Sequence, residues 1–435
     1  MTDHRSDPTD SASRTDAANQ AEGANPAPVD RPLSILIAGD TFSPDVNGAA
    51  KFTEHLASGM AGRGHDVHVL CPAASRRHGT WTESYDGEKI TAHRAPSYRW
   101  LPHDWLRFSV PWRARHYARK ALDAAKPDVV HFQSAVIFGR AVAIEAEARG
   151  IRVIGTNHLM PENIMEHSLL PKALHDPVAN LWWKDARKTY ARASAVTTPT
   201  RRAAGFLERH GHVDHVLAIS CGLKGSDYTP DFAEKPVQRI LFVGRVTGEK
   251  HIDVLLRAVK LLPADLPHPI ELGIVGGGDQ KANLEKLAQE LGIADRTRFY
   301  GYVSDQELRA LYTGSTVFAM PSIAELQSIA TMEAMASGLP VVAANAMALP
   351  HLCHDGENGF LFEPGNERDL AEKLERILRL PQAERVEMAK RGLEMVQMHD
   401  IDRTLELFER LYRGESVADV AKDSVNEQDH SLDQA

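Results

Sequence analysis

Short apolar runs alternate with helically spaced segments along most of the chain, and this alternation limits the fold more than any other feature. The run Leu33–Ala38 is short enough for a buried strand, and apolar residues recur at helical spacing over 49–62. Another strand is predicted at 66–71. Strands that alternate with helices indicate parallel sheets made of βαβ units, so the predicted fold class is α/β.

The alternation falls into two blocks. After further predicted strands at 128–132, 151–155 and 195–198, a stretch at 225–235 rich in Gly, Pro and Asp interrupts the pattern. The pattern then restarts, with strands predicted at 239–243, 271–275, 298–300, 317–320 and 341–344. A chain of 435 residues is long for one core. We therefore predict two Rossmann-like parallel-sheet domains that face one another across a cleft.

The predicted boundaries follow these blocks. The first domain spans 31–225, the second spans 236–398, and a helix at 399–414 returns to the first domain. Residues 1–30 and 415–435 are polar, and the second of these segments is acidic, so both are expected to be disordered tails.

Composition excludes several classes of protein. A net charge of −9 argues against nucleic-acid binding, and no apolar run approaches the ~20 residues that span a bilayer. No signal peptide is visible, and the three cysteines form no metal or redox motif, so buried free thiols are expected. These features favour a cytoplasmic protein. Binding to the inner face of the plasma membrane stays open.

Two glutamates mark the end of a predicted strand in the second domain. Glu325 follows the strand at 317–320, and Glu333 lies about one turn into the next helix. Ligands of open α/β sheets bind at the carboxyl ends of strands, against helix N-termini. The pair is therefore a candidate for contacts with a bound substrate, and the alternative is two solvated glutamates on a helix face.

Two further loops follow strands of the same domain. Arg245 and Lys250 come after the strand at 239–243 and suit a diphosphate, unless they are solvated charges on a surface loop. Gly277 is the middle residue of a glycine-rich turn after the strand at 271–275. This turn suits a phosphate or base contact, but a tight turn explains it equally, because the GxGxxG spacing is missing.

In the first domain, Gly48 lies between the first strand and helix, facing the expected cleft. His158 follows the strand at 151–155, where imidazole can donate or accept a hydrogen bond near neutral pH. The chain has 21 histidines, and only this position at a strand end distinguishes His158 from them.

The segment 89–120 is basic in an otherwise acidic chain. It contains eight Lys and Arg residues and one acid, interleaved with Trp100, Trp105, Phe108, Trp112 and Tyr117. Basic and aromatic residues together suit an anionic bilayer surface. The alternative is that the aromatics belong to the core and the arginines pair with the acidic tails.

Taken in order, the Gly48 loop, His158, Arg245 with Lys250, and Glu325 with Glu333 resemble the retaining GT-B glycosyltransferases of family four, over about residues 33–413. The resemblance implies His158 and Glu325 as catalytic residues at the transferred sugar. It implies Glu333 as a ribose contact and Arg245 and Lys250 as diphosphate contacts. The donor-binding set implied in this way is Gly48, Arg245, Lys250, Gly277, Glu325, Leu326, Gln327, Ser328 and Glu333.

The resemblance also implies an activity: transfer of a hexose, mannose or glucose, from a UDP- or GDP-sugar with retention of configuration. No Asp-x-Asp motif follows a suitable strand, so we expect no metal and no cofactor. The form Pro44-x-Val-Asn-Gly48 is similar to members that glycosylate lipids. Asn47-Gly48 replaces two adjacent glycines, and Leu326-Gln-Ser328 replaces Gly-Phe-Gly, so the identity of the donor stays open.

The alternatives are an enzyme of another class, such as a nucleotide-sugar epimerase or an NAD-linked enzyme, a glycosyltransferase with a soluble or polysaccharide acceptor, and a non-catalytic binding protein. The missing GxGxxG argues against NAD. The five polar residues His158, Arg245, Lys250, Glu325 and Glu333 together argue against a loss of catalysis. The base, the sugar, the acceptor and the oligomeric state cannot be inferred from the sequence.

Overall fold

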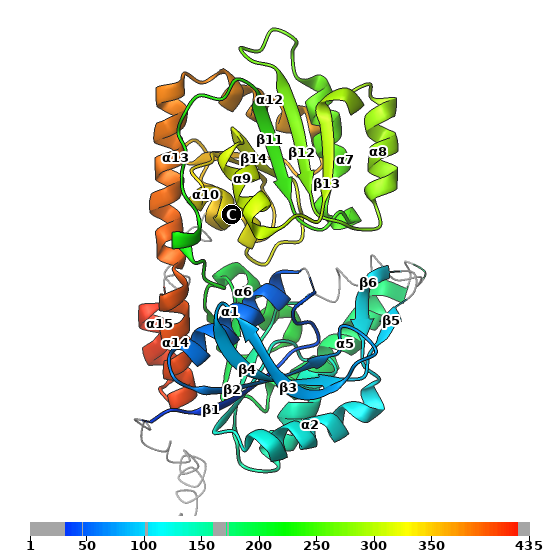
Figure 1. Cartoon of the computed structure of the whole chain (residues 1–435), viewed down its shortest axis with the longest axis vertical. Helices are drawn as coiled ribbons and strands as arrows, with labels where there is room; N and C mark the ends of the chain where they lie inside the picture. The colour runs from blue at the N-terminus through cyan, green and yellow to red at the C-terminus, as the bar shows by residue number, and fades with distance from the viewer. Residues whose placement is uncertain (1–30, 46, 101–102, 160–170, 172–173, 425–435) are drawn as a thin grey trace, which may run out of the picture.

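The structure is a computed structural model that describes residues 31–45, 47–100, 103–159, 171 and 174–424, with only the backbone of 100 and 103–106. Two α/β domains are stacked end to end, the first below and the second above in Figure 1. Each is built around its own mostly parallel sheet. The predicted fold class and its two Rossmann-like domains are therefore confirmed, and all ten predicted strands are present.

The sheet of the first domain has eight strands in the order β10-β9-β8-β7-β1-β2-β4-β3, and only β3 at its edge runs antiparallel to its neighbour. A hairpin of two short strands stands apart from this sheet. The strands are β1 (Ser34–Ala38), β2 (Asp66–Pro72), β3 (Gly79–Tyr85), β4 (Glu88–Ala95), β7 (Val129–Phe132), β8 (Arg152–Thr156), β9 (Ala195–Thr198) and β10 (Leu217–Ala218), with β5 (Tyr98–Trp100) and β6 (His103–Phe108) in the hairpin. The helices are α1 (Gly48–Gly62), α2 (Pro111–Ala125), α3 (Phe138–Glu147), α5 (His175–Tyr190) and α6 (Arg201–Gly211).

The central strand β1 shows why the sequence forms a sheet covered on both faces. Its side chains alternate, so that Ile35 and Ile37 enter one core while Leu36 and Ala38 enter the other. All four are fully buried. A strand buried on both faces must be apolar throughout, which explains the continuous apolar run.

The sheet of the second domain has six strands, all parallel, in the order β13-β12-β11-β14-β15-β16. Its strands are β11 (Gln238–Val243), β12 (Ile270–Val275), β13 (Thr297–Gly301), β14 (Val317–Met320), β15 (Val341–Ala344) and β16 (Gly359–Phe362). Its helices are α7 (Ile252–Leu261), α8 (Lys281–Glu290), α9 (Asp305–Thr313), α10 (Ile329–Ala336), α11 (Leu349–Leu352), α12 (Glu367–Arg379) and α13 (Gln382–Val396). Short 3₁₀ turns lie at Gly225–Asp227, Gly248–Lys250, Ala294–Arg296 and Gln397–His399.

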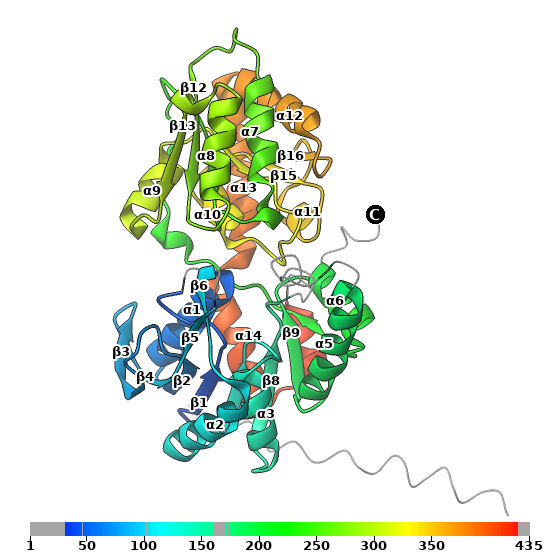
Figure 2. The same ribbon diagram turned by 90° about the vertical axis from the view of Figure 1, so that its right-hand side faces the viewer.

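Two chain segments connect the domains. The first is the stretch between β10 and β11. The second runs from α13 on the second domain to α14 (Ile401–Arg413), which packs on the first, along one side of the molecule (Figures 1 and 2). The two segments are paired where they pass, since Leu223 N donates to His399 O at 2.7 Å and Ile401 N donates to Leu223 O at 3.0 Å. Leu405 and Phe408 of α14 belong to the first domain's core.

The prediction of a disordered tail over 415–435 is wrong for its first part. A further helix, α15 (Val417–Asp423), packs beside α14, and Val420 is completely buried in the first domain's core. The helix forms because Val417, Val420 and Ala421 give it an apolar stripe at helical spacing. Residues 1–30 and 425–435 lie outside the described part of the chain.

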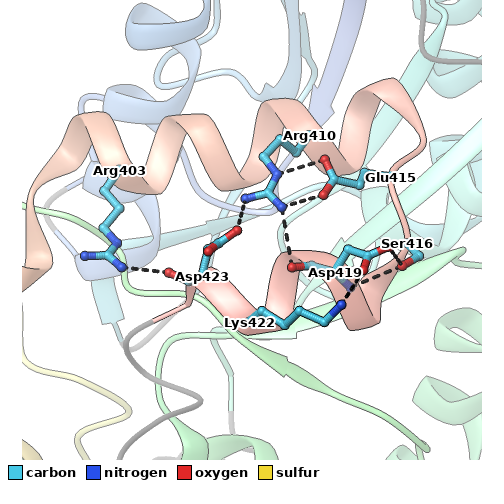
Figure 3. Close-up of polar contacts among 7 residues, drawn as sticks. All are labelled: Arg403, Arg410, Glu415, Ser416, Asp419, Lys422 and Asp423. Carbon is cyan, nitrogen blue, oxygen red and sulfur yellow. Dashed lines mark hydrogen bonds and ion pairs between the residues drawn. The ribbon is translucent and has the colours of Figure 1, made fainter.

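Arg410 of α14 makes polar contacts with the segment that contains α15 (Figure 3). Its guanidinium donates to Glu415 at 2.8 Å and to Asp423 at 2.7 Å, and Arg403 donates to the carbonyl oxygen of Asp423 at 2.9 Å. Glu415 and Asp423 therefore pair with an arginine of the preceding helix, and their charge does not keep residues 415–424 unfolded.

Loops at the carboxyl ends of both sheets meet at the junction of the domains. Thr200, just after β9, donates from its hydroxyl to the carbonyl oxygen of Leu326 at 2.9 Å. The side-chain oxygen of Gln327 accepts from Cys221 N at 2.8 Å, and its amide nitrogen donates to the Ser220 hydroxyl at 2.8 Å. This junction is therefore where a ligand of an α/β sheet is expected to bind.

Candidate active site

The loop after β11 holds its arginine with a buried acid. Arg245 donates to the Glu249 carboxylate at 3.1 Å, and the Thr247 hydroxyl donates to the same oxygen at 2.7 Å. Glu249 is only 2% exposed, so it is fixed in place, and its carbonyl oxygen accepts from Ile323 N at 3.2 Å. A buried carboxylate that is hydrogen-bonded in this way limits the directions in which the guanidinium can point.

Lys250 and Glu325 form an ion pair between two strand-end loops. The Lys250 ammonium donates to the Glu325 carboxylate, and both side chains are nearly buried. Lys250 ends the 3₁₀ turn after β11, and Glu325 follows β14, the strand next to β11 in the sheet. The predicted cation and the predicted acid thus lie together at the carboxyl edge of the sheet.

The glycine-rich turn after β12 lies against the same loop. Gly276 has a φ of +122°, and a side chain there would overlap the carbonyl oxygen of Gly244. Val246 N donates to the carbonyl oxygen of Gly277 at 2.9 Å, and a Cβ at Gly277 would come within 2.6 Å of the Tyr302 ring. The need for space beside Gly244 and Tyr302 thus explains Gly276 and Gly277, as the alternative of a tight turn predicted. The turn still lies next to Arg245.

The segment after Glu325 faces the first domain. Both polar groups of the Gln327 side chain are engaged with Ser220 and Cys221, and Gln327 is 3% exposed. Ser328 has a φ of +82° and its hydroxyl lies 2.8 Å from that of Thr331. The side chain of Gln327 therefore joins the domains, and the predicted ligand contacts of 326–328 would fall to the backbone.

Glu333 is held separately from Glu325. One oxygen of its carboxylate accepts from the Tyr228 hydroxyl and the other from the Tyr312 hydroxyl, each at 2.8 Å. Burial raises the pKa of Glu333, whereas the two hydrogen bonds and the charge of Lys51 lower it. Lys51 belongs to α1 of the first domain, so the carboxylate faces the junction of the two domains.

The first domain presents His158 at its strand end. The Nε2 atom of His158 lies 3.0 Å from the side-chain oxygen of Gln133, and its ring lies 4.9 Å from that of Phe52. Burial lowers the pKa of His158 to about 3, so the imidazole is neutral near pH 7. A neutral ring must donate from Nε2 to the Gln133 oxygen, which leaves Nδ1 as an acceptor.

A second histidine stands behind His158. His131 is fully buried, with Nδ1 at 2.6 Å from the Tyr412 hydroxyl and Nε2 at 2.6 Å from the Thr156 hydroxyl. Burial and the neighbouring His158 lower its pKa to about 3. Both histidines at this end of the sheet are thus neutral.

Gly48 begins α1, next to Asn47, whose side chain accepts from Ala50 N at 2.9 Å. A Cβ at Gly48 would lie 3.9 Å from Ile329, the first residue of α10 in the other domain. The Gly48 loop therefore lies beside the helix that carries Glu333.

In the described part of the chain, no three His, Cys, Asp or Glu side chains gather in a way that could hold a metal ion. Over the same residues, no helix has the length and apolar character needed to cross a bilayer. All three cysteines are buried free thiols, as the sequence predicted.

Comparison with known protein families matches both halves of the chain. Residues 46–224 match Glycosyltransferase Family 4, and residues 231–395 match Glycosyl transferases group 1. The chain is therefore a glycosyltransferase, with one of these two families in each half. Sucrose-phosphate synthase from Thermosynechococcus elongatus has the same GT-B fold, with a TM-score of 0.71 and 20% identity over 87% of this chain and 98% of that one.

Curated relatives of this glycosyltransferase include two that align along most of their length. A D-inositol 3-phosphate glycosyltransferase from Nocardioides sp. is 26% identical over 84% of this chain and 86% of the relative. A GDP-mannose-dependent alpha-mannosyltransferase from Corynebacterium glutamicum is 26% identical over 77% of each chain. An uncharacterized glycosyltransferase from Methanocaldococcus jannaschii is 37% identical, but the match spans only 35% of its length.

Four residues near the site of this glycosyltransferase were missed in the sequence. Glu249 holds Arg245, Tyr228 and Tyr312 hold Glu333, and Gln133 contacts His158. Glu249 is adjacent to Lys250, and Gln133 directly follows a predicted strand. Their positions in the sequence could therefore have identified them as candidates for the site. No pattern in the sequence connects either tyrosine with Glu333.

The basic segment 89–120 is only partly a free surface. Arg94 is buried and paired with Glu83 at 2.6 Å, and Arg107 donates to the Ser97 hydroxyl at 2.8 Å and to the carbonyl oxygen of Ala73 at 3.1 Å. These two arginines are structural, so they do not add to the basic surface of this segment. The side chains of Trp100 and Trp105 lie outside the described part of the chain.

One exposed part of the segment is a face of α2. Trp112 is 80% exposed, and the charged residues of this face are exposed as well. Arg115 and Arg119 share one acid, Glu145, at 2.7 and 3.1 Å. The face thus presents an aromatic side chain beside a surplus of positive charge. Its basic residues are Arg113, Arg115, Arg119 and Lys120, and its acid Asp123 is paired with Arg149 at 2.9 Å.

Proposed function

We propose that this glycosyltransferase moves a hexose, mannose or glucose, from a UDP- or GDP-sugar to an acceptor hydroxyl with retention of configuration and without a metal. The single observation that carries the proposal is the ion pair of Lys250 and Glu325 at the carboxyl edge of the second sheet. It sets a cation for the donor's phosphates beside an acid for the sugar, as the family resemblance implies.

The donor contacts divide among the diphosphate, the transferred sugar and the ribose. Arg245, held by Glu249, and Lys250 bind the diphosphate, because a planar fork and a mobile ammonium together suit its oxygens. Glu325 contacts hydroxyls of the transferred sugar, and Glu333 accepts from the ribose hydroxyls. Gly48, Gly277 and the backbone of 326–328 complete the donor site.

The chemistry follows from the charges. As the bond between the anomeric carbon and the phosphate oxygen breaks, negative charge grows on the leaving nucleoside diphosphate. Arg245, Lys250 and backbone amides stabilise that charge, which is the largest contribution that such a site can make. The neutral His158 lies at the sugar as a hydrogen-bonding group, and the acceptor hydroxyl attacks from the face that the leaving group vacates.

The proposed acceptor is a membrane lipid of the diacylglycerol or phosphatidylinositol type, reached from the cytoplasmic face of the membrane. Support comes from the exposed face of α2, where Trp112 stands beside basic side chains. Tryptophan suits the interface of a bilayer, and each basic residue near an anionic surface contributes roughly 1 kcal/mol. Liposome co-sedimentation tests this part: absence of pelleting with anionic vesicles at low salt would remove it.

A soluble acceptor is the second candidate. A relative aligned over 86% of its length is a D-inositol 3-phosphate glycosyltransferase, which favours a phosphorylated polyol. Both candidates keep the same donor site. They differ in whether turnover needs a lipid surface.

A panel of UDP- and GDP-sugars tests the proposal as a whole. Binding and slow hydrolysis would be measured for each sugar alone, with anionic lipid extract, and with inositol phosphates. Selective binding of one donor, with turnover that rises when lipid is added, is the expected result. A rise only with inositol phosphate would favour the soluble acceptor. Binding of no nucleotide sugar would overturn the proposal.

A further inference from the structure

Two tyrosines from different parts of the chain donate hydrogen bonds to one carboxylate at the junction of the domains. Tyr312 belongs to α9, and Tyr228 follows the 3₁₀ turn in the segment that joins the domains. Their hydroxyls lie 2.8 Å from the two oxygens of Glu333, and their rings are 6.3 Å apart in an edge-to-face arrangement. The carboxylate is therefore fixed from two sides.

The fixed carboxylate keeps acceptor capacity for a ligand. An ionised carboxylate offers about four lone-pair sites, and the two phenols use two of them. Glu333 is half-buried rather than sealed, and α10 carries it toward Lys51 of the first domain. Two adjacent hydroxyls, such as those of a ribose, match the two lone pairs that remain.

We propose that Tyr228 and Tyr312 are positioning residues for the ribose of the donor, because they hold Glu333 in the orientation that accepts from both ribose hydroxyls. The inference rests on the proposed role of Glu333 in donor binding. Tyr228 adds a second consequence. Since it lies in the joining segment, occupation of the ribose site is tied directly to the chain that connects the two domains.

The charges around Glu333 decide how the tyrosines act. Burial raises the pKa of Glu333, and the phenol hydrogen bonds and Lys51 lower it, whereas Asp305 raises it. Loss of the Tyr228 hydroxyl therefore raises the pKa of Glu333 further. A protonated carboxyl accepts fewer hydrogen bonds, so nucleotide binding in Tyr228→Phe should weaken at a higher pH than in the wild-type protein.

The test is calorimetric binding of UDP and GDP, each compared with its 2′,3′-dideoxy form. In Tyr228→Phe, the affinity for the nucleotide with both ribose hydroxyls should fall about tenfold, the size of one hydrogen bond to a charged group. The dideoxy nucleotide lacks the groups that Glu333 would bind. Its affinity should be the same in variant and wild type, so the effect depends on the ribose.

Tyr300→Phe is the matched control. Tyr300 also donates to a glutamate of the second domain, Glu271, at 3.2 Å, but Glu271 lies at the beginning of β12, at the edge of the sheet away from the junction. Its removal should change neither nucleotide's affinity. Thermal melting of every variant checks the fold, and Tyr312→Phe provides a second test through the other phenol.

The outcomes distinguish a failure of this inference from a failure of the proposed function. Equal losses for ribose and dideoxy nucleotides, or no loss in either tyrosine variant while the wild type binds, would overturn this inference alone. Failure of the wild-type protein to bind any nucleotide would overturn the proposed function together with it. A shift of the pH dependence of nucleotide binding toward higher pH in Tyr228→Phe, and no shift in Tyr300→Phe, is the expected result.

Discussion

The two domains prepare their sides of the junction by different means. In the second domain, charged groups are held by buried or hydrogen-bonded partners: Arg245 by Glu249, Lys250 by Glu325, and Glu333 by two tyrosines. In the first domain, His158 and His131 are held neutral by burial. A donor diphosphate needs fixed charge, whereas a sugar needs only a neutral hydrogen-bonding partner, so the difference matches the roles proposed for the two domains.

The largest effect is expected from Lys250→Met. This substitution removes the cation and leaves the nearly buried Glu325 without its ion-pair partner. We expect kcat/KM for donor turnover to fall by about 100-fold to 1,000-fold, the range for one group that stabilises developing charge. Lys286→Met, a 76% exposed lysine of α8, is the control and should be unchanged. A fall of less than threefold in Lys250→Met would contradict the role given to charge in the second domain.

Glu249→Gln tests the same donor site of the second domain with a smaller expected effect. It keeps the shape of the side chain but weakens its hold on Arg245 and on the Thr247 hydroxyl. A charged hydrogen bond is worth about 1.5–3 kcal/mol, so the KM for the donor should rise by roughly tenfold or more. Steady-state kinetics checks this, with thermal melting to show that the fold survives. An unchanged KM would mean that Arg245 needs no support from Glu249.

The first domain is tested by pH, because its histidines are neutral. The pKa of His131 is lowered to about 3 in the folded protein, so as pH falls below about 6.5 this histidine takes up a proton in the unfolded chain but not in the folded one. Between about pH 7 and pH 5 this removes about 2 kcal/mol from the free energy of unfolding. His131→Gln should lose about 2 kcal/mol less than the wild type over this range, because His158, whose pKa is also lowered to about 3, keeps its own contribution, whereas a substitution of the exposed His78 should lose as much as the wild type. Urea unfolding at the two pH values measures both, and parallel losses in wild type and His131→Gln would refute the assignment.

The smallest expected effect is at the surface of the first domain. Trp112→Ala should weaken binding to anionic liposomes several-fold, because an exposed tryptophan contributes to binding at the bilayer interface. Donor hydrolysis in solution should not change. Leu261→Ala, an exposed apolar residue of α7 in the second domain, is the matched control. Equal liposome binding by both variants would place any membrane contact elsewhere.

The sequence predicted the interior of the fold better than its edges. Most of the ten predicted strands were predictable because burial on both faces requires continuous apolar runs, and the edge strand β13, with the pattern Thr-Arg-Phe-Tyr-Gly, is an exception. The edge strand β3 was missed, since its side chains are exposed or half-buried and polar residues interrupt it. Helix α15 was missed because its acidic residues resemble those of a tail, and their pairing with Arg410 requires the folded chain.

The candidate site divides in the same way. Residues placed after strands could be predicted, because strand ends in a parallel sheet gather at one edge. Their supporting partners could not, since they come from distant parts of the chain: Tyr228 lies 105 residues from Glu333, and Gln133 lies 25 residues from His158. The engagement of Gln327 with Ser220 was equally unpredictable, because it depends on how the two domains meet.

The most direct test of the central claim is a single comparison of Glu325→Ala with the wild-type protein in a donor-turnover assay, with nucleotide binding followed in parallel. If Glu325 acts on the transferred sugar, the variant should bind UDP or GDP with an unchanged melting temperature while turnover falls by at least about 100-fold. Glu290→Ala, an exposed glutamate of α8, should turn over normally. Near-normal turnover in Glu325→Ala would contradict the account.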